Sequence, residues 1–104
     1  MVITFARARA LEVLAAHAEF PDAVTAAVFA RMLWPYAAGW SKASNAGTHG
    51  TRYGCGMWRA GGGFLGKLTK EGLAHCWLRP GGQPEWSITA AGLAALREYE
   101  EDPQ

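Results

Sequence analysis

Charge, cysteine and long apolar runs are all scarce in this chain. No uninterrupted apolar run approaches the roughly 18 residues of a membrane-spanning helix, so no membrane segment is expected. The N-terminal hydrophobic residues precede the first basic residues, which is the reverse of the order in a secretory signal. The two cysteines, Cys55 and Cys76, form no Cys-x-x-Cys pair, and this usage indicates a reducing, cytoplasmic setting.

Catalytic signatures are also missing from the sequence. It contains no serine-nucleophile motif and no acidic pair near a histidine, and its glycine runs lack the Gly-Lys-Ser/Thr ending of a phosphate-binding loop. His49, Cys55, His75 and Cys76 are metal-ligating residue types, but their spacing does not match a zinc finger. His75 and Cys76 are adjacent, so on a strand they point to opposite faces. We therefore expect no enzyme, no metal site and no cofactor.

The composition is that of one folded domain spanning residues 1–104. Half of the residues are hydrophobic and 18% are charged, which is too apolar for a disordered segment. The formal net charge is +1, yet residues 39–79 carry a net +5 and residues 80–104 a net −4. A polyanion would be attracted to the basic middle of the chain and repelled by its acidic end.

Apolar spacing predicts helical segments. In each of them hydrophobic residues recur every three or four positions, the period of one helix face. In the second segment Val24, Ala27, Val28 and Met32 share such a face. The predicted helices cover residues 4–19, 23–33, 57–71 and 90–100.

Capping and turn residues mark the element boundaries. Asp22 and Thr89 are expected to cap the second and the last helix, because their side chains can accept from unpaired backbone amides. Gly72 is expected at the end of the third helix, where a left-handed residue is favourable. Residues 73–79 and 85–89 flank a Pro-Gly-Gly-Gln-Pro turn and predict a β-hairpin.

Residues 36–56 show no apolar period and contain many glycines and no acid. Connections of this length in small domains are usually functional or disordered, so we expect an inserted loop. The glycines at 61–63 complicate the next helix, since each costs ~1 kcal/mol in a helix interior. Either the helix begins near Gly63, or the glycines admit the close approach of another molecule.

The five tryptophans fall into two groups. Trp34, Trp77 and Trp86, at a helix end and on the predicted strands, are expected in the core. Trp40 and Trp58 flank the predicted loop and are candidates for exposure. Exposed aromatic residues suit a protein interface or base stacking, unless they pack the loop onto the body.

The order helix, helix, long loop, helix, hairpin, helix resembles a winged helix-turn-helix domain of the mostly α, α+β class. The resemblance covers nearly the whole chain and is carried by ARMLW at 30–34, FLGKLTKEGL at 64–73 and WSITAAGLAAL at 86–96. This pattern is similar to bacterial transcription regulators of the multiple-antibiotic-resistance and phenolic-acid-regulator types, and small chains of this kind are common in actinobacteria and their phages. The insertion at residues 36–56 departs from the family, which has a short turn there.

The resemblance implies that the third helix enters the major groove of double-stranded DNA and that the hairpin reaches the adjacent backbone or minor groove. Arg59 is then the candidate base reader, because a guanidinium can bridge both acceptors of a guanine edge. Lys67 and Lys70 are candidate phosphate or base contacts. Arg79 and Gln83 at the tip of the hairpin are candidates for backbone contacts.

The long loop adds a second group of candidates. Lys42, Arg52 and Tyr53 lie within it, and they either contact DNA or belong to a surface insertion of no such role. A homodimer that uses the first and last helices would keep the acidic end away from the DNA.

The sequence therefore favours a DNA-binding winged helix, either a small transcription regulator or a phage accessory factor. The alternative is a winged helix used as a protein interaction module without DNA binding. Fold alone does not determine function, so a winged helix need not bind DNA. The glycine triplet and the oversized loop are the features that favour this alternative.

Overall fold

The computed structural model describes residues 2–16, 23–45, 51–78 and 80–101. Within these ranges the chain is a mostly helical α+β structure with four helices and a small three-stranded antiparallel sheet. The elements in chain order are α1 (Phe5–Ala15), β1 (Val24–Thr25), α2 (Ala26–Leu33), the 3-10 helix η1 (Ala38–Ser41), β2 (Ala43–Asn45), β3 (Thr51–Tyr53), α3 (Cys55–Lys70), β4 (Ala74–Trp77), β5 (Glu85–Ile88) and α4 (Ala90–Glu101).

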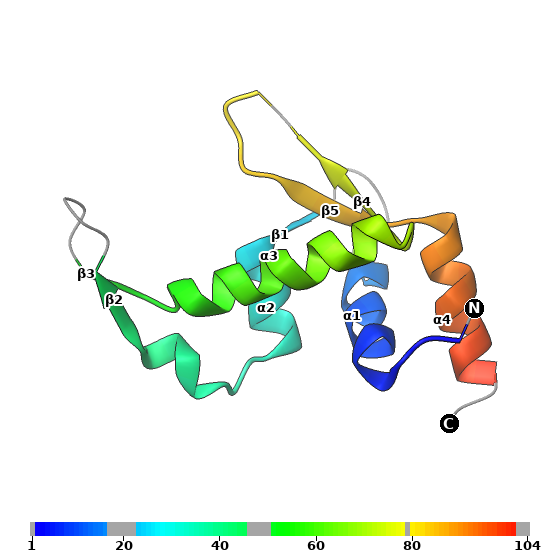
Figure 1. The fold of residues 1–104 in the computed structure, drawn as a ribbon, viewed down its shortest axis with the longest axis horizontal. Coiled ribbons are helices and arrows are strands. Elements are labelled where there is room, and N and C mark those ends of the chain that lie inside the picture. The colour runs from blue at the N-terminus through cyan, green and yellow to red at the C-terminus, as the bar shows by residue number, and fades with distance from the viewer. Residues whose placement is uncertain (1, 17–22, 46–50, 79, 102–104) are drawn as a thin grey trace.

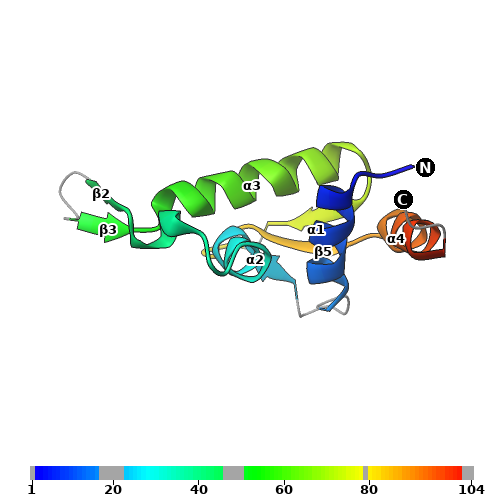
Figure 2. The same cartoon turned by 90° about the horizontal axis from the view of Figure 1, so that it is seen from below.

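Helix α3 runs along the long axis of the molecule, with hairpin β2–β3 beyond its first turn and α4 toward the opposite end (Figure 1). Seen from below, α3 lies along one side, and α2 and β5 lie beneath it (Figure 2). The most extensive contact between elements is that of α2 with α3. None of the described helices combines the length and the apolar character needed to cross a membrane.

The three-stranded sheet has the order β1-β5-β4, with both pairs antiparallel. The hairpin β4–β5 confirms the two predicted strands, and Cys76 lies opposite Trp86 in its register. Strand β1 was not predicted, because two residues are too few to show a period; it pairs Val24 with Trp86. This pairing joins the start of α2 to the hairpin that follows α3.

The prediction of an irregular loop at residues 36–56 was wrong for its described part. After the turn of η1, strands β2 and β3 pair antiparallel, with Ala43 opposite Tyr53. Helix α3 then begins at Cys55, after Gly54 in a left-handed conformation. The glycines at 61–63 lie inside α3, so a helix start near Gly63 was also wrong.

The first two helices differ from the prediction at their ends. The hydroxyl of Thr4 caps α1 by accepting from the amide of Arg7, and regular helix ends at Ala15. Residues 17–19 of the predicted helix lie outside the described residues. Thr25 caps α2 by accepting from the amide of Val28, so Asp22, which also lies outside the described residues, is not its N-cap.

The predicted end of α3 is confirmed in detail. Gly72 has φ +78°, and its amide donates to the carbonyl of Thr69 at 3.1 Å. The amide of Leu73 donates to the carbonyl of Leu68 at 2.9 Å, which completes a Schellman motif. This motif turns the chain directly into β4 and sets the hairpin beside the end of α3.

Thr89 caps α4, as predicted. Its hydroxyl accepts from the amide of Gly92 at 3.0 Å and donates to the carbonyl of Gly72 at 2.7 Å. One side chain thus satisfies a backbone group at the start of α4 and another at the end of α3.

The core forms where the helices meet the three-stranded sheet. Its largest fully buried side chains come from α1, α2, α3 and the turn before β4, and they are Phe29, Leu11, Leu14, Leu65, Leu68 and Leu73. Gly61 allows α2 and α3 to approach closely. A Cβ at this position would lie 2.8 Å from the carbonyl oxygen of Ala26 and 2.9 Å from the Cβ of Ala30.

Several hydrophobic residues do not lie where their spacing places them. Phe5 is 69% exposed, although its spacing of three residues from Ala8 predicts that it shares the buried face of the first helix. Val28 and Met32 are also exposed, because α2 turns Phe29 and Ala30 toward the core instead. Trp77, expected in the core, is 36% exposed on the outer face of the hairpin.

Candidate nucleic-acid interface

The outer face of α3 brings together three of the predicted DNA-binding residues. Arg59, Lys67 and Lys70 are all exposed. At 3.6 residues per turn, their side chains leave the helix within roughly 80° of one another. Within the described ranges, none of the three forms a salt bridge. Their charges are therefore available to an anionic partner.

Glycines occupy the same face of α3. A Cβ built on Gly56, Gly63 or Gly66 would meet nothing within 4 Å, in contrast to Gly61 on the buried side. Packing inside the protein therefore does not require glycine at these three positions. Each glycine nevertheless costs ~1 kcal/mol of helix stability relative to alanine. Because glycine has no side chain, a partner can approach the backbone of α3 closely on this face.

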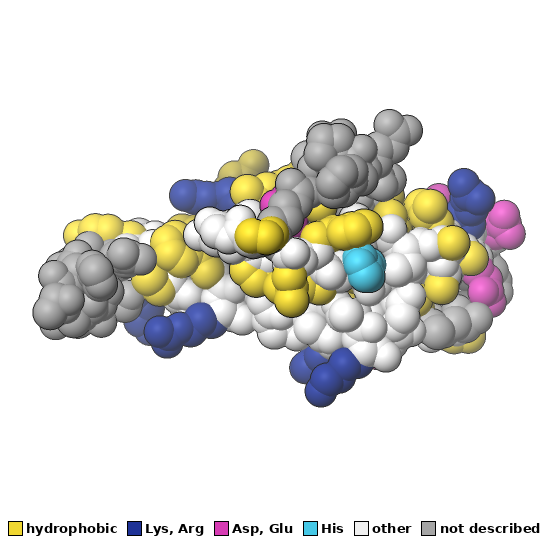
Figure 3. Space-filling view, turned by 90° about the horizontal axis from the view of Figure 1, so that it is seen from above, with side chains coloured by type: hydrophobic (Ala, Val, Ile, Leu, Met, Phe, Trp, Pro, Cys, Tyr) yellow, Lys and Arg dark blue, Asp and Glu magenta, His cyan; other side chains and the backbone are white. Residues whose placement is uncertain are grey.

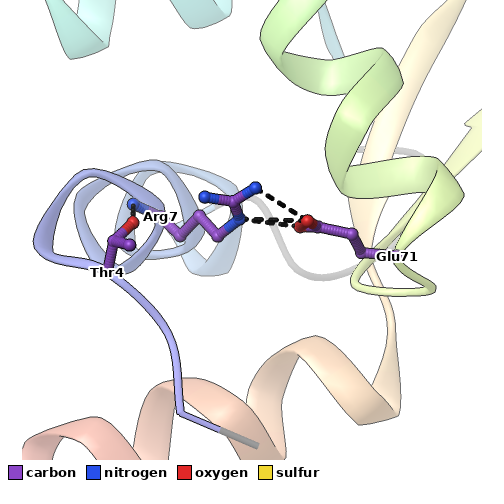
Figure 4. Close-up of polar contacts among 3 residues, drawn as sticks. All are labelled: Thr4, Arg7 and Glu71. Atoms are coloured by element: carbon purple, nitrogen blue, oxygen red, sulfur yellow. Dashed lines mark hydrogen bonds and ion pairs between the residues drawn. The ribbon is translucent and has the colours of Figure 1, made fainter.

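The acidic residue that follows α3 is paired with a cation of another helix. Arg7 of α1 reaches Glu71 and holds its carboxylate with Nε–Oε1 and Nη2–Oε2 distances of 2.7 Å (Figure 4). These hydrogen bonds lower the pKa of Glu71, with a smaller contribution from the charge of Lys67, and they raise the pKa of Arg7. The carboxylate is thus engaged by α1.

The insertion places a further cation beside Arg59. Lys42 is exposed after η1, and both residues line one hollow of about 300 Å³ at the start of α3, together with Cys55 and Gly56. Arg52 lies on β3 opposite Ser44. The structure therefore places Lys42 near Arg59, at the start of α3.

Tyr53, the third predicted DNA-binding residue of the insertion, does not line the hollow that Lys42 and Arg59 share. Tyr53 is 61% exposed and lines a separate hollow, whose walls include Trp40 and Trp58. The expectation that Trp58 is exposed is confirmed, at 37%, and Trp40 is half-buried. Sequence reasoning missed the exposed residues of α2 in this hollow, because their helical spacing is also that of core positions.

The hairpin β4–β5 presents a largely apolar described surface. Gln83 is exposed in its turn, and Arg79 lies outside the described residues. Leu78 is 79% exposed, and the ring of Trp77 packs edge-on against His75 and donates to the hydroxyl of Ser87. Figure 3 shows hydrophobic side chains across the middle of the face that includes this hairpin, with Lys and Arg side chains standing at its border.

Comparisons of the chain with protein-family models, with curated proteins and with solved structures found no match. Across the described part of the chain, no group of three or more His, Cys, Asp or Glu side chains is placed to hold a metal ion. Cys55 and Cys76 are free thiols.

Proposed function

We propose that this chain is a winged helix protein that binds double-stranded DNA, either as a small transcription regulator or as a phage accessory factor. The order of elements supports this proposal, because a helix pair is followed by α3 and then directly by the hairpin β4–β5. The pairing of β1 with β5 anchors that hairpin to the start of α2. In a winged helix this arrangement sets the wing beside the recognition helix.

The observation that carries the proposal is the exposed face of α3, which bears Arg59, Lys67 and Lys70 and no acid. An α-helix of 16 residues is about 24 Å long, and the major groove of DNA admits such a helix. In the groove, Arg59 would read a guanine edge and the two lysines would contact phosphates or bases. The bare glycine positions on this face would let α3 lie deep in the groove.

The two hairpins extend this contact at the ends of α3. Lys42 of the insertion would reach phosphates beyond the first turn of α3, and Gln83 of the wing would reach the backbone on the other side. Arg52 and Arg79 are candidates for similar contacts from their positions in the sequence alone. The insertion replaces a short turn and so lengthens the stretch of DNA that the protein is proposed to contact. Phosphate contacts of this kind position a protein on DNA without reading its sequence.

The proposal includes a homodimer through the outer faces of α1 and α4. These helices pack against each other within the chain, and α1 leaves Phe5 exposed as an apolar contact. The acidic residues of α4 would then lie away from the DNA.

A fluorescence anisotropy titration with a mixed-sequence duplex, at several salt concentrations, tests DNA binding. The logarithm of the affinity should fall linearly with the logarithm of the salt concentration, with a slope of about −0.9 per neutralised phosphate. A flat signal at low salt would instead support a winged helix that serves only as a protein interaction module. The exposed apolar hollow beside α2 is the observation that favours this second function.

A further inference from the structure

An apolar groove lies beside α2, where that helix, α3 and the insertion meet. This open groove has a volume of about 410 Å³, within the usual size range of binding clefts. Its principal lining residues are Val28, Arg31, Met32, Trp40, Tyr53 and Trp58. None of them belongs to the cationic face of α3.

The groove exposes large hydrophobic side chains in one place. Val28 is 46% exposed, Tyr53 is 61% exposed, and Met32 and Trp58 are each 37% exposed. Scattered exposed hydrophobic residues are ordinary, whereas a contiguous apolar patch marks an interaction site. Val28 and Met32 are one helical turn apart, so they form a ridge of the kind that packs into the groove of a facing helix.

A fixed cation stands at the edge of this groove. The guanidinium carbon of Arg31 lies 4.3 Å from the centre of the Trp40 ring. The indole of Trp40 is held in turn, since its Nε1 donates to the carbonyl of Trp34 at 2.6 Å. Within the described residues Arg31 forms no salt bridge. Its guanidinium is thus positioned in advance for a partner's carboxylate.

The charge of the surrounding segment selects the partner. Arg31 is the one charged residue among the described residues that line the groove, and residues 23–70, which supply its walls, contain neither Asp nor Glu. A second copy placed groove to groove would bring like charges together. The acidic helix α4 of a second copy would not fill the groove either, because its exposed side chains are alanines and charged residues.

We propose that this groove binds an acidic amphipathic helix of another protein. Large apolar side chains of that helix would lie between the Val28–Met32 ridge and Trp58, and one of its carboxylates would pair with Arg31. A nucleic acid fits less well, since aliphatic side chains form one wall and a single cation lines the groove. The side chains of adjacent helical residues are separated by about 100° around the helix axis, so Trp58 and Arg59 point to different sides of α3. The groove can therefore be occupied while α3 contacts DNA.

Two synthetic helical peptides test this proposal on the whole chain. Both carry the same leucine and phenylalanine residues at helical spacing, flanked by glutamates in one peptide and by lysines in the other. Binding is followed by calorimetry and by intrinsic tryptophan fluorescence, since Trp40 and Trp58 line the groove. The acidic peptide is expected to bind about tenfold more tightly than the basic one.

Substitutions then assign the site. Arg31→Glu is expected to abolish or reverse the preference for the acidic peptide, and Met32→Glu or Val28→Glu to weaken its binding by about tenfold or more. Val2→Glu, at an 85% exposed apolar residue outside the groove, is the matched control and should change nothing. Circular dichroism of each variant checks that the fold is intact.

Equal affinity for the two peptides, no binding of either at millimolar concentration, or indifference to Arg31→Glu would overturn the proposal. A single-stranded dT oligonucleotide that binds the wild type but not Met32→Glu would assign the groove to nucleic acid instead. A dimer dissociated by Met32→Glu would assign it to a second copy. Duplex affinity measured on the same variants should stay unchanged, which separates this result from that of the proposed DNA binding.

Discussion

Arg7 and Glu71 join the first turn of α1 to the residue that ends α3. Two hydrogen bonds of 2.7 Å connect the Nε and Nη2 atoms of the guanidinium to the two carboxylate oxygens (Figure 4). Each side chain is about one third exposed, so solvent screens the pair. The contact holds the carboxylate toward α1 and leaves Arg59, Lys67 and Lys70 as the charged groups of the α3 face.

Glu71→Gln is expected to lower the free energy of unfolding at pH 7 by about 0.5 kcal/mol, the usual value for a well-aligned surface pair. The pKa of Glu71 is lowered in the folded state, so the contribution of the carboxylate is present above its unfolded pKa. It is lost as the pH falls through the lowered folded pKa. Urea unfolding of both proteins at neutral and acidic pH measures this difference, with Glu12→Gln as the control on a looser pair of 3.9 Å. A difference that is independent of pH would contradict the assignment.

Gly61→Ala and Gly63→Ala form a matched pair within α3. The Cβ at position 61 would collide with the carbonyl of Ala26 and with Ala30, so a loss of about 1–3 kcal/mol is expected despite the better helix former. The Cβ at position 63 enters open space, and the variant should gain up to about 1 kcal/mol. Thermal and urea unfolding measure both changes.

The variants Gly61→Ala and Gly63→Ala also test whether the exposed glycines of α3 serve DNA binding. If α3 lies deep in the major groove, Gly63→Ala should weaken duplex binding while it stabilises the protein. A variant that is both more stable and equally tight in binding would show that the exposed glycines do not serve close approach.

Thr89→Ala is expected to cost about 1–2 kcal/mol, because it removes both the cap of α4 and the hydrogen bond to Gly72. Thr89→Ser keeps the hydroxyl and should cost less than about 0.5 kcal/mol. Chemical unfolding of the two variants gives the comparison. Similar losses for alanine and serine would mean that the methyl group of Thr89, and not its hydroxyl, is the stabilising part.

Local chemistry made much of the fold predictable. The Schellman motif at Gly72 and the cap at Thr89 depend on residues within a few positions of each helix end, so the sequence contains their signals. Strand β1 is different, because its two residues are extended only through pairing with distant β5. The hairpin β2–β3 was missed for a related reason: its short segments carry no apolar alternation, and their pairing depends on tertiary context.

Of the two candidate surfaces, one could be predicted from the sequence and the other could not. The cationic stripe of α3 follows from helical spacing alone, which is why Arg59, Lys67 and Lys70 could be named from the sequence. The apolar groove could not, because Val28 and Met32 have the spacing of core residues. Only the rotation of α2, which buries Phe29 and Ala30, shows that this ridge faces outward. The cation–π contact joins Arg31 of α2 to Trp40 of η1, and the sequence does not predict how these two elements lie relative to each other.

The salt dependence of duplex binding by single lysine variants tests the central claim most directly. Lys67→Ala and Lys70→Ala should each weaken binding and reduce the magnitude of the log–log salt slope by about 1, the effect of one lost phosphate contact. Arg31→Ala, at an exposed cation on α2 outside the α3 face, should leave both affinity and slope unchanged. A wild-type slope that both lysine variants retain, or that Arg31→Ala reduces equally, would contradict DNA recognition by α3.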